Sequence, residues 1–244
     1  MIPIATRGLA RLWRLALSDI LATLRDPMLV IAATMCLVPP LLFALWGDEI
    51  RAFGLRQFGL SNLLLLLAPV AIMLPASLIG WVVGFLLLED RDEGTLLALS
   101  VTPVGKGGVL GFRLIAAGAL SAMLAAATLP FVLPGLDPGH ALGVLVLVGL
   151  SGVLATVALP ALARNKVEGL ALTKISNLAI IVPLAALLPA PFRYGLGWLP
   201  SYWLGELLLV DANPMAASLA VAVGVALHLA AIGLLIRRFL NRSG

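Results

Sequence analysis

A short charged segment near the middle of the chain is the stretch best suited to recognising a partner. It lies between two long apolar stretches and consists of Glu89, Asp90, Arg91, Asp92, Glu93, Gly94 and Thr95. Its four acids and one base cannot lie in lipid, so we expect a loop between two membrane spans. Residues 95–100 then predict a short helix that ends before Thr102 and Pro103. Such a helix is either a solvated, capped turn or one stabilised by a partner surface.

Residues that could support catalysis or metal binding are scattered along the chain. Cys36 is the single cysteine, which excludes an internal disulfide and a thiolate metal cluster. His140 falls in a predicted loop and His228 in the last apolar stretch, where we expect it to bond a neighbouring helix, with no mid-span acid to complete a proton relay. The sequence at 105–107 lacks the glycine spacing and the hydroxyl of a P-loop. We therefore expect neither an enzyme active site nor a metal or nucleotide bound by this chain.

The composition is that of a protein embedded in a lipid bilayer. Hydrophobic residues make up 61% of the chain and charged residues 11%, and the mean hydropathy is +1.11. A helix needs roughly 20 apolar residues to cross the hydrocarbon core, where the backbone must satisfy its own hydrogen bonds. Six stretches qualify, at about 28–46, 62–88, 114–133, 142–163, 167–189 and 214–236. We predict an all-α integral membrane protein with one transmembrane domain over residues 1–244.

Basic residues are distributed unequally between the two sides of the membrane. Of the 16 Lys and Arg residues, all but Arg51, Arg56 and Arg193 lie before the first span, within 89–113, within 164–174 or after the last span. Because lysine and arginine are retained on the cytoplasmic side, both termini and the 89–113 loop are expected there. This bias explains the pI of 9.8, and the lack of basic runs interleaved with aromatic residues argues against nucleic acid as a partner.

The first 27 residues predict an amphipathic helix that lies along the membrane surface. Apolar side chains recur with helical spacing and form one stripe, made of Leu9, Leu12, Trp13, Ala16, Leu17, Ile20, Leu21 and Leu24. Arginines and Asp19 occupy the opposite side, where they would face the lipid headgroups. Asp26 and Pro27 end this helix and direct the chain into the first span.

Residues 190–213 fit neither a clean span nor a clean loop. Prolines and glycines interrupt the helical pattern, and aromatic side chains of the kind found at the membrane–water boundary lie between them. We expect two short re-entrant helices in the outer leaflet. Glu206 is the acid in this segment that could be partly buried, which makes it a candidate functional residue. The alternative is a side chain that is exposed at the membrane interface.

A pathway through the membrane would be mostly apolar. Ser77 lies inside the second predicted span, and Thr173 and Asn177 share one face of the fifth, where they serve either helix packing or a polar lining. These residues and Glu206 are the candidates for a substrate pathway. Such a pathway suits an amphipathic or lipid-soluble molecule better than an inorganic ion or a sugar.

Three blocks of the sequence resemble a known family. Residues 88–96 followed by Thr102 and Pro103 look like the first cytoplasmic loop of ABC-2-type transporter permeases. Residues 165–171 and 199–203 resemble further blocks of the branch that exports fluoroquinolones or other drugs. The resemblance covers the whole chain in the number and order of its spans.

The resemblance implies a six-span half-transporter in a bacterial cytoplasmic membrane. It implies a second six-span permease subunit and separate ABC ATPase subunits, which would bind ATP and Mg²⁺ in place of this chain. It also implies that 89–113 holds a coupling helix docked on the ATPase. The alternative is a proton- or ion-coupled secondary transporter, which typically needs intramembrane acids and often inverted repeats. Lipid, peptide antibiotic and haem remain alternative substrates of the family.

Overall fold

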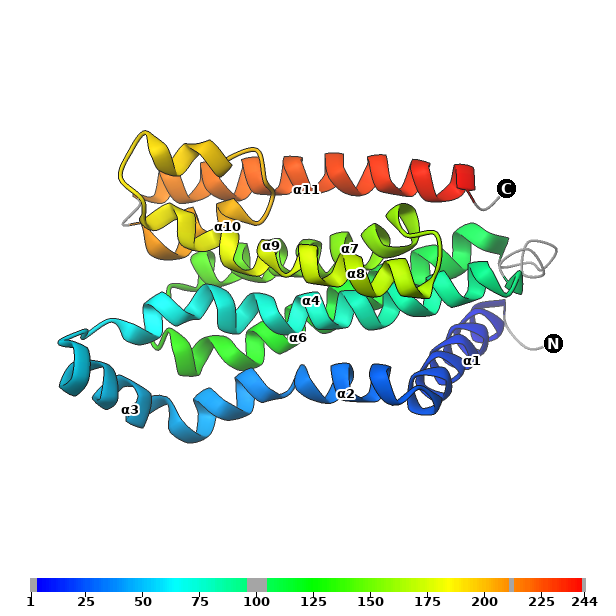
Figure 1. The fold of residues 1–244 in the computed structure, drawn as a ribbon, viewed down its shortest axis with the longest axis horizontal. Helices are drawn as coiled ribbons and strands as arrows, with labels where there is room; N and C mark the ends of the chain where they lie inside the picture. Colours follow the sequence, from blue (N-terminus) through cyan, green and yellow to red (C-terminus); the bar gives the residue numbers. More distant parts are fainter. Residues whose placement is uncertain (1–3, 96–104, 211–212, 243–244) are drawn as a thin grey trace.

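The structure is a computed structural model that describes residues 4–95, 105–210 and 213–242. Within these described residues, six helical segments are long and apolar enough to cross a membrane: Pro27–Phe58, Leu63–Asp92, Gly105–Val132, Pro138–Leu162, Lys166–Leu187 and Pro214–Asn241. The six-span, all-α prediction is thereby confirmed. The spans lie roughly side by side along the long axis of the molecule (Figure 1).

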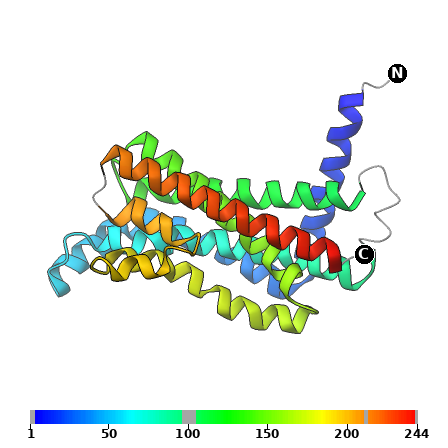
Figure 2. The ribbon, with the colours of Figure 1, turned by 90° about the horizontal axis from the view of Figure 1, so that it is seen from above.

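Helix α1 (Ile4–Arg25) precedes the first span and crosses the bundle axis instead of following it (Figure 2). Most large apolar side chains that the structure describes on its predicted stripe are exposed in the single chain: Trp13, Leu17, Ile20, Leu21 and Leu24. An exposed apolar stripe on a helix that crosses the direction of the spans is compatible with a position in the headgroup plane.

The first span is longer than predicted and is divided into α2 (Pro27–Met35) and α3 (Val38–Phe58). The division falls at Cys36 and Leu37, just before Pro39 and Pro40. Proline has no backbone N–H and its ring crowds the preceding turn, so a continuous helix cannot form there. Asp26 starts α2 by accepting bonds from the backbone N–H groups of Met28 and Leu29.

The loop after the second span is shorter than the predicted 89–113 segment. Helix α4 (Leu63–Asp92) continues through the acidic residues, and α6 (Gly105–Val132) begins before Lys106. Glu93 caps α4, and Gly94 turns the chain with φ +74°, so Asp92 and Glu93 form the end of α4. Residues 96–104, with Thr102, Pro103 and most of the predicted coupling helix, lie outside the described residues.

The remaining spans are α7 (Pro138–Leu162), a broken fifth span, and α11 (Pro214–Arg242). The fifth span consists of α8 (Lys166–Ser176), α9 (Leu178–Ile181) and the 3₁₀ turn η1 (Val182–Leu187). Within the membrane His228 of α11 is 2.9 Å from the Ser151 hydroxyl of α7 through Nε2. This confirms that the histidine bonds a neighbouring helix.

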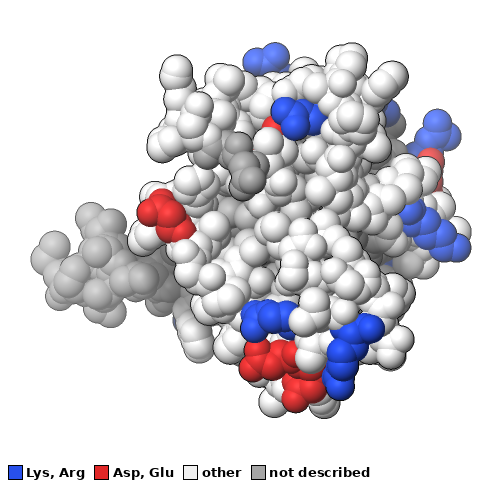
Figure 3. All heavy atoms as spheres, turned by 90° about the vertical axis from the view of Figure 1, so that its left-hand side faces the viewer, with Lys and Arg blue, Asp and Glu red and all other residues white. Residues whose placement is uncertain are grey.

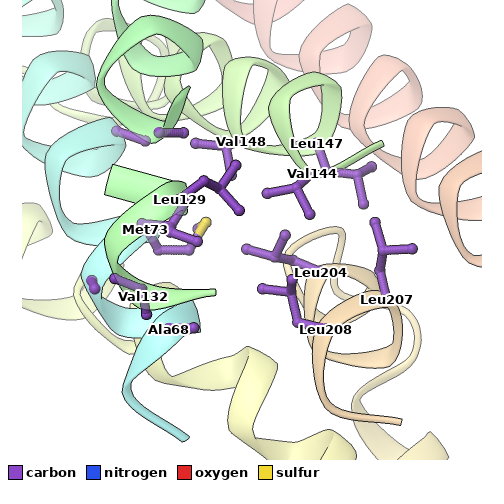
Figure 4. Close-up of a cluster of buried hydrophobic side chains, with 14 of the residues drawn as sticks. Ala68, Met73, Leu129, Val132, Val144, Leu147, Val148, Leu204, Leu207 and Leu208 are labelled. Atoms are coloured by element: carbon purple, nitrogen blue, oxygen red, sulfur yellow. The ribbon is translucent and has the colours of Figure 1, made fainter. Parts of the chain in front are cut away.

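Two short helices lie between the fifth and last spans, as predicted: η2 (Phe192–Leu196) and α10 (Tyr202–Leu209). Leucines of α10 fill a cluster of buried side chains from α4, α6 and α7 (Figure 4): Ala68, Met73, Leu129, Val132, Val144, Leu147, Val148, Leu204, Leu207 and Leu208. Helix α10 is therefore packed into one end of the bundle.

Helices α4 and α7 form the centre of the bundle and approach each other closely. A Cβ added to Gly80 of α4 would lie 2.4 Å from the Ala155 Cβ and 2.8 Å from the Gly152 carbonyl oxygen of α7. Small residues here permit the backbone-to-backbone packing that membrane helices use in place of hydrophobic driving force.

The described basic residues separate between the two ends of the bundle. The chain ends, the C-terminus of α4 and the N-termini of α6 and α8 share one end (Figure 1). The opposite end is mostly uncharged, apart from scattered groups such as the one at its lower edge (Figure 3). Arg51, Arg56 and Arg193 belong to α3 and η2 at that end, in agreement with the predicted bias.

Candidate functional site

Arg113 is the centre of a buried ion-pair cluster at the end of the bundle that holds both termini. It lies in the third turn of α6 with only 8% of its side chain exposed. Its Nε and Nη2 donate to the two carboxylate oxygens of Asp19 on α1, at 3.0 and 2.6 Å. Its Nη1 donates to Asp90 on α4 at 2.5 Å. One guanidinium thus joins three helices, in the two-pronged geometry that makes arginine–carboxylate pairs strong.

Lys166 forms a second junction beside the first. Its ammonium group, at the start of α8, donates to Asp26 at 2.5 Å and lies 3.7 Å from the Glu89 carboxylate of α4. The Lys166 hydrogen bond, partly opposed by burial, lowers the pKa of Asp26 below its ordinary value. Asp26 therefore both caps α2 and fixes α8.

Arg91 connects α4 to the C-terminus of α7. Its guanidinium donates to the backbone carbonyls of Pro160, Ala163 and Arg164 at 2.7, 3.1 and 2.9 Å. These carbonyls have no partner within the helix, and a cation there also meets the negative end of the helix dipole. We use the name charged cluster for these seven residues: Asp19, Asp26, Glu89, Asp90, Arg91, Arg113 and Lys166.

A polar cavity of about 670 Å³ opens beside the charged cluster, between α1, α4 and α6. Acidic side chains predominate among its described lining residues: Asp19, Asp26, Glu89, Asp90 and Glu93, against Arg25 and Arg113. Asp92 and Glu93 are exposed, and Thr95 also lines the cavity. The arrangement offers an acidic surface to basic groups, next to helices that are fixed to one another.

In the structure the residues of the predicted 89–95 segment have two different roles. Glu89, Asp90 and Arg91 contact residues of other helices and hold α4 to its neighbours. Asp92 pairs with the adjacent Arg91 at 3.1 Å, and Glu93 is exposed. The outward-facing part that could contact a partner is therefore residues 92–95.

The four predicted pathway residues do not meet in one place. Ser77 is buried midway along α4. Thr173 donates to the Leu170 carbonyl within α8, and Asn177 is exposed at the end of α8. Glu206 lies at the opposite end from the charged cluster, where it accepts a bond from the Tyr202 hydroxyl and pairs with Arg193 at 3.3 Å. The neighbouring Ser176 receives a bond from Trp81 of α4 at 3.0 Å, which is a packing contact.

Sequence reasoning missed the partners within the charged cluster. Asp19 counted only as part of the polar side of α1, and Arg113 and Lys166 only as orienting charges. One signal was available. Asp19 is an acid on the helix side that is expected to face anionic headgroups, and an acid is unfavourable there unless a basic side chain pairs with it. Its partner is 94 residues away, which no local pattern specifies.

The fold and the charged cluster define a multi-pass membrane protein, and comparisons identify its family. A family described as "Fluoroquinolones export permease protein Rv2686c-like" matches residues 19–236, and the chain belongs to this family. The family resemblance predicted from the three sequence blocks is thus confirmed, and the chain is a transporter component and not an enzyme.

Two curated relatives come from Mycobacterium tuberculosis. They are the fluoroquinolones export permease proteins MT2760, of strain CDC 1551 / Oshkosh, and Rv2686c, of strain ATCC 25618 / H37Rv. Each is 30% identical to this chain over 238 residues, and the match covers 91% of both sequences. No solved structure matches the chain.

Proposed function

We propose that this chain is the permease subunit of an ATP-binding-cassette exporter that moves an amphipathic, drug-like molecule out of a bacterial cell. The relatives' names support the substrate class, since both are fluoroquinolone export permeases. ATP and Mg²⁺ would be bound by separate ATPase subunits on the cytoplasmic side. In this proposal both termini and the charged cluster face the cytoplasm, following the distribution of lysine and arginine.

The observation that carries the proposal is the continuity between the exposed residues 92–95 and the charged cluster. Residues 92–95 follow directly on α4, which Asp90 and Arg91 fix to α6 and α7. Lys166 adds α8, and Asp19 adds α1. Buried ion pairs are costly to break, so a displacement applied at residues 92–95 by an ATPase subunit would be transmitted to five helices together.

The proposal includes a second six-span subunit, identical or homologous, with the transport pathway between the two. Helix α4 is enclosed by α6 and α7 over most of its length, whereas the first, fifth and last spans are largely exposed in the single chain. The exposed spans are therefore the ones available to face a second subunit. Alternating access would follow from relative movement of the two subunits around the pathway.

Charge reversal at the exposed residues tests the proposed coupling. We expect the double substitution Asp92→Lys and Glu93→Lys to abolish ATP-driven export while the protein keeps its thermal stability, because both side chains are exposed. The measurement is substrate-stimulated ATPase activity and export in vesicles that hold this chain with its co-purifying ATPase. The matched control is Asp48→Lys with Glu49→Lys, two exposed acids in α3 at the opposite end of the bundle.

Two outcomes would contradict the proposal. Unchanged ATP-driven export by the Asp92/Glu93 variant would show that this surface does not couple the chain to the ATPase. Accumulation of substrate driven by a proton gradient in vesicles that hold this chain alone would establish the ion-coupled transporter instead.

A further inference from the structure

A second cavity, mostly apolar, lies within the span region and shares Asp19, Leu86 and Arg113 with the polar one. It has a volume of about 480 Å³ between α1, α2, α4 and α6, within the range of roughly 300–1,000 Å³ typical of small-molecule sites, and it is open on one side, where Leu24 and Met123 are exposed. Its walls are aliphatic and aromatic side chains that include Leu37, Ile79, Phe112 and Met123. Among its described lining residues, Asp19 and Arg113 carry the charges, and both lie at one end.

The charge at that end is negative once the pairing is counted. Arg113 is bonded through all three nitrogens to two carboxylates, those of Asp19 and Asp90. At neutral pH the three groups together carry one net negative charge. A bound anion would have to displace one of these carboxylates, whereas an ammonium group can use the acceptor sites that remain on Asp19.

We infer that this cavity binds the hydrophobic body of a lipophilic amine and that Asp19 receives its protonated nitrogen. An apolar site with a negative charge at one end selects a molecule that has an apolar body and a positive charge at one end. The low dielectric of the surroundings strengthens the attraction between the ammonium and the carboxylate. This inference rests on the proposed function only in naming the ligand as export cargo, since binding needs neither ATP nor a partner.

The test uses norfloxacin as its methyl ester, a fluorescent quinolone with a basic piperazine and no free carboxylate, and the N-acetyl derivative of the same ester, which has the same ring system but cannot be protonated there. Binding to the purified full-length chain in lipid nanodiscs is followed by fluorescence anisotropy at pH 7. We expect the norfloxacin ester to bind at least about tenfold more tightly than the N-acetyl compound. Equal affinity of the two compounds for the unaltered chain would overturn the inference.

Two variants locate the binding. Asp19→Asn keeps a hydrogen-bonding side chain toward Arg113 but removes the negative charge, so the norfloxacin ester should bind about tenfold more weakly and the N-acetyl compound nearly unchanged. Ala116→Trp, in the cavity wall, should weaken both compounds, whereas Ala119→Trp, exposed on the same helix, should weaken neither. If Ala116→Trp affects neither compound, the cavity is filled by lipid or by a second subunit and the inference is wrong.

Export measured with the ATPase partner separates this inference from the proposed function. Loss of binding by Ala116→Trp with undiminished ATP-driven export would place the cargo elsewhere and leave the permease proposal intact. Binding as expected, but no ATP-driven export by the unaltered complex, would refute the permease proposal and leave the amine site intact.

Discussion

At the scale of single residues, the charges near the membrane boundary are held by partners and not by water. Arg113 is nearly buried, yet each of its nitrogens meets a carboxylate. Burying a charge is expensive unless it is paired and hydrogen-bonded. The charged cluster therefore makes the position of α1 depend on α6 and α4, because large apolar side chains of α1 such as Trp13 and Leu21 are exposed in the single chain.

Replacing Arg113 should destabilise the protein strongly. Arg113→Met leaves Asp19 and Asp90 without their shared partner, and removal of one member of a buried pair costs roughly 3–5 kcal/mol. The control is Arg51→Met, whose pair with Asp48 is exposed by 44% and 91% and should contribute less than about 1 kcal/mol. Thermal unfolding of the purified variants in detergent measures both, and an equal effect of the two would show that the buried pairs do not stabilise the fold.

Asp26 should make stability depend on pH on the acid side. The Lys166 hydrogen bond lowers the folded-state pKa of Asp26 below its ordinary value of 3.8. The associated stability is therefore present above about pH 4 and is lost as the pH falls through the folded-state pKa. Asp26→Asn, which can still cap α2, should lower the melting temperature near neutral pH and flatten its decline in acid. Parallel acid profiles of variant and parent would contradict this.

At the scale of elements, helix packing depends on small residues at the points of closest approach. Helices α4 and α7 meet at Gly80, Gly152 and Ala155, where little room remains for any added atom. The prolines inside α4, Pro69 and Pro75, are accommodated in the same buried helix. Such contacts transmit displacement efficiently because tightly packed interiors do not compress.

A single methyl group at this contact should separate the two central helices. Gly80→Ala would place its Cβ 2.4 Å from that of Ala155, and overpacking of this kind costs about 1–3 kcal/mol. Gly111→Ala is the matched control, since that helical glycine has no atom within 4 Å of the added Cβ, and it should be neutral or stabilising by up to about 1 kcal/mol. The melting temperature should therefore fall for Gly80→Ala and stay unchanged or rise for Gly111→Ala. An equal fall in both variants would exclude the close contact between α4 and α7 as the cause.

At the scale of the whole molecule, the proposed orientation follows from the end-to-end separation of charge. Basic residues gather with the chain ends, whereas the opposite end carries scattered groups of both signs on a mostly uncharged surface (Figure 3). Such a bias identifies the cytoplasmic face, because basic loops are retained in the cytoplasm. Every proposal about an ATPase partner depends on this orientation.

Labelling of single cysteines measures the orientation directly. In a Cys36→Ala background, Gly107→Cys at the start of α6 should react with a membrane-impermeant maleimide only from the cytoplasmic side. Gly139→Cys at the start of α7 should react only from outside, since both positions are exposed and a full span separates them. The reverse pattern would place the charged cluster outside the cell and exclude a cytoplasmic ATPase at residues 92–95.

The sequence alone determined the number of spans, the amphipathic first helix and the short helices before the last span. These features depend on hydrophobic length and periodicity, which are local properties set against a bilayer of fixed thickness. The family followed from short blocks for the same reason, since their residues are adjacent along the chain. The proline pair at 39–40 was visible too, but its effect in dividing the first span was not predicted.

Only the tertiary structure decided how the charges are satisfied and therefore where the helices end. The acids from Glu89 to Asp92 predicted a loop because isolated charges are excluded from helices in lipid. In the fold, Glu89 and Asp90 meet Lys166 and Arg113, and Arg91 meets the carbonyls of α7, so α4 continues through them. The choice of partner depends on which helices lie side by side, and packing of distant segments sets this where the local sequence does not.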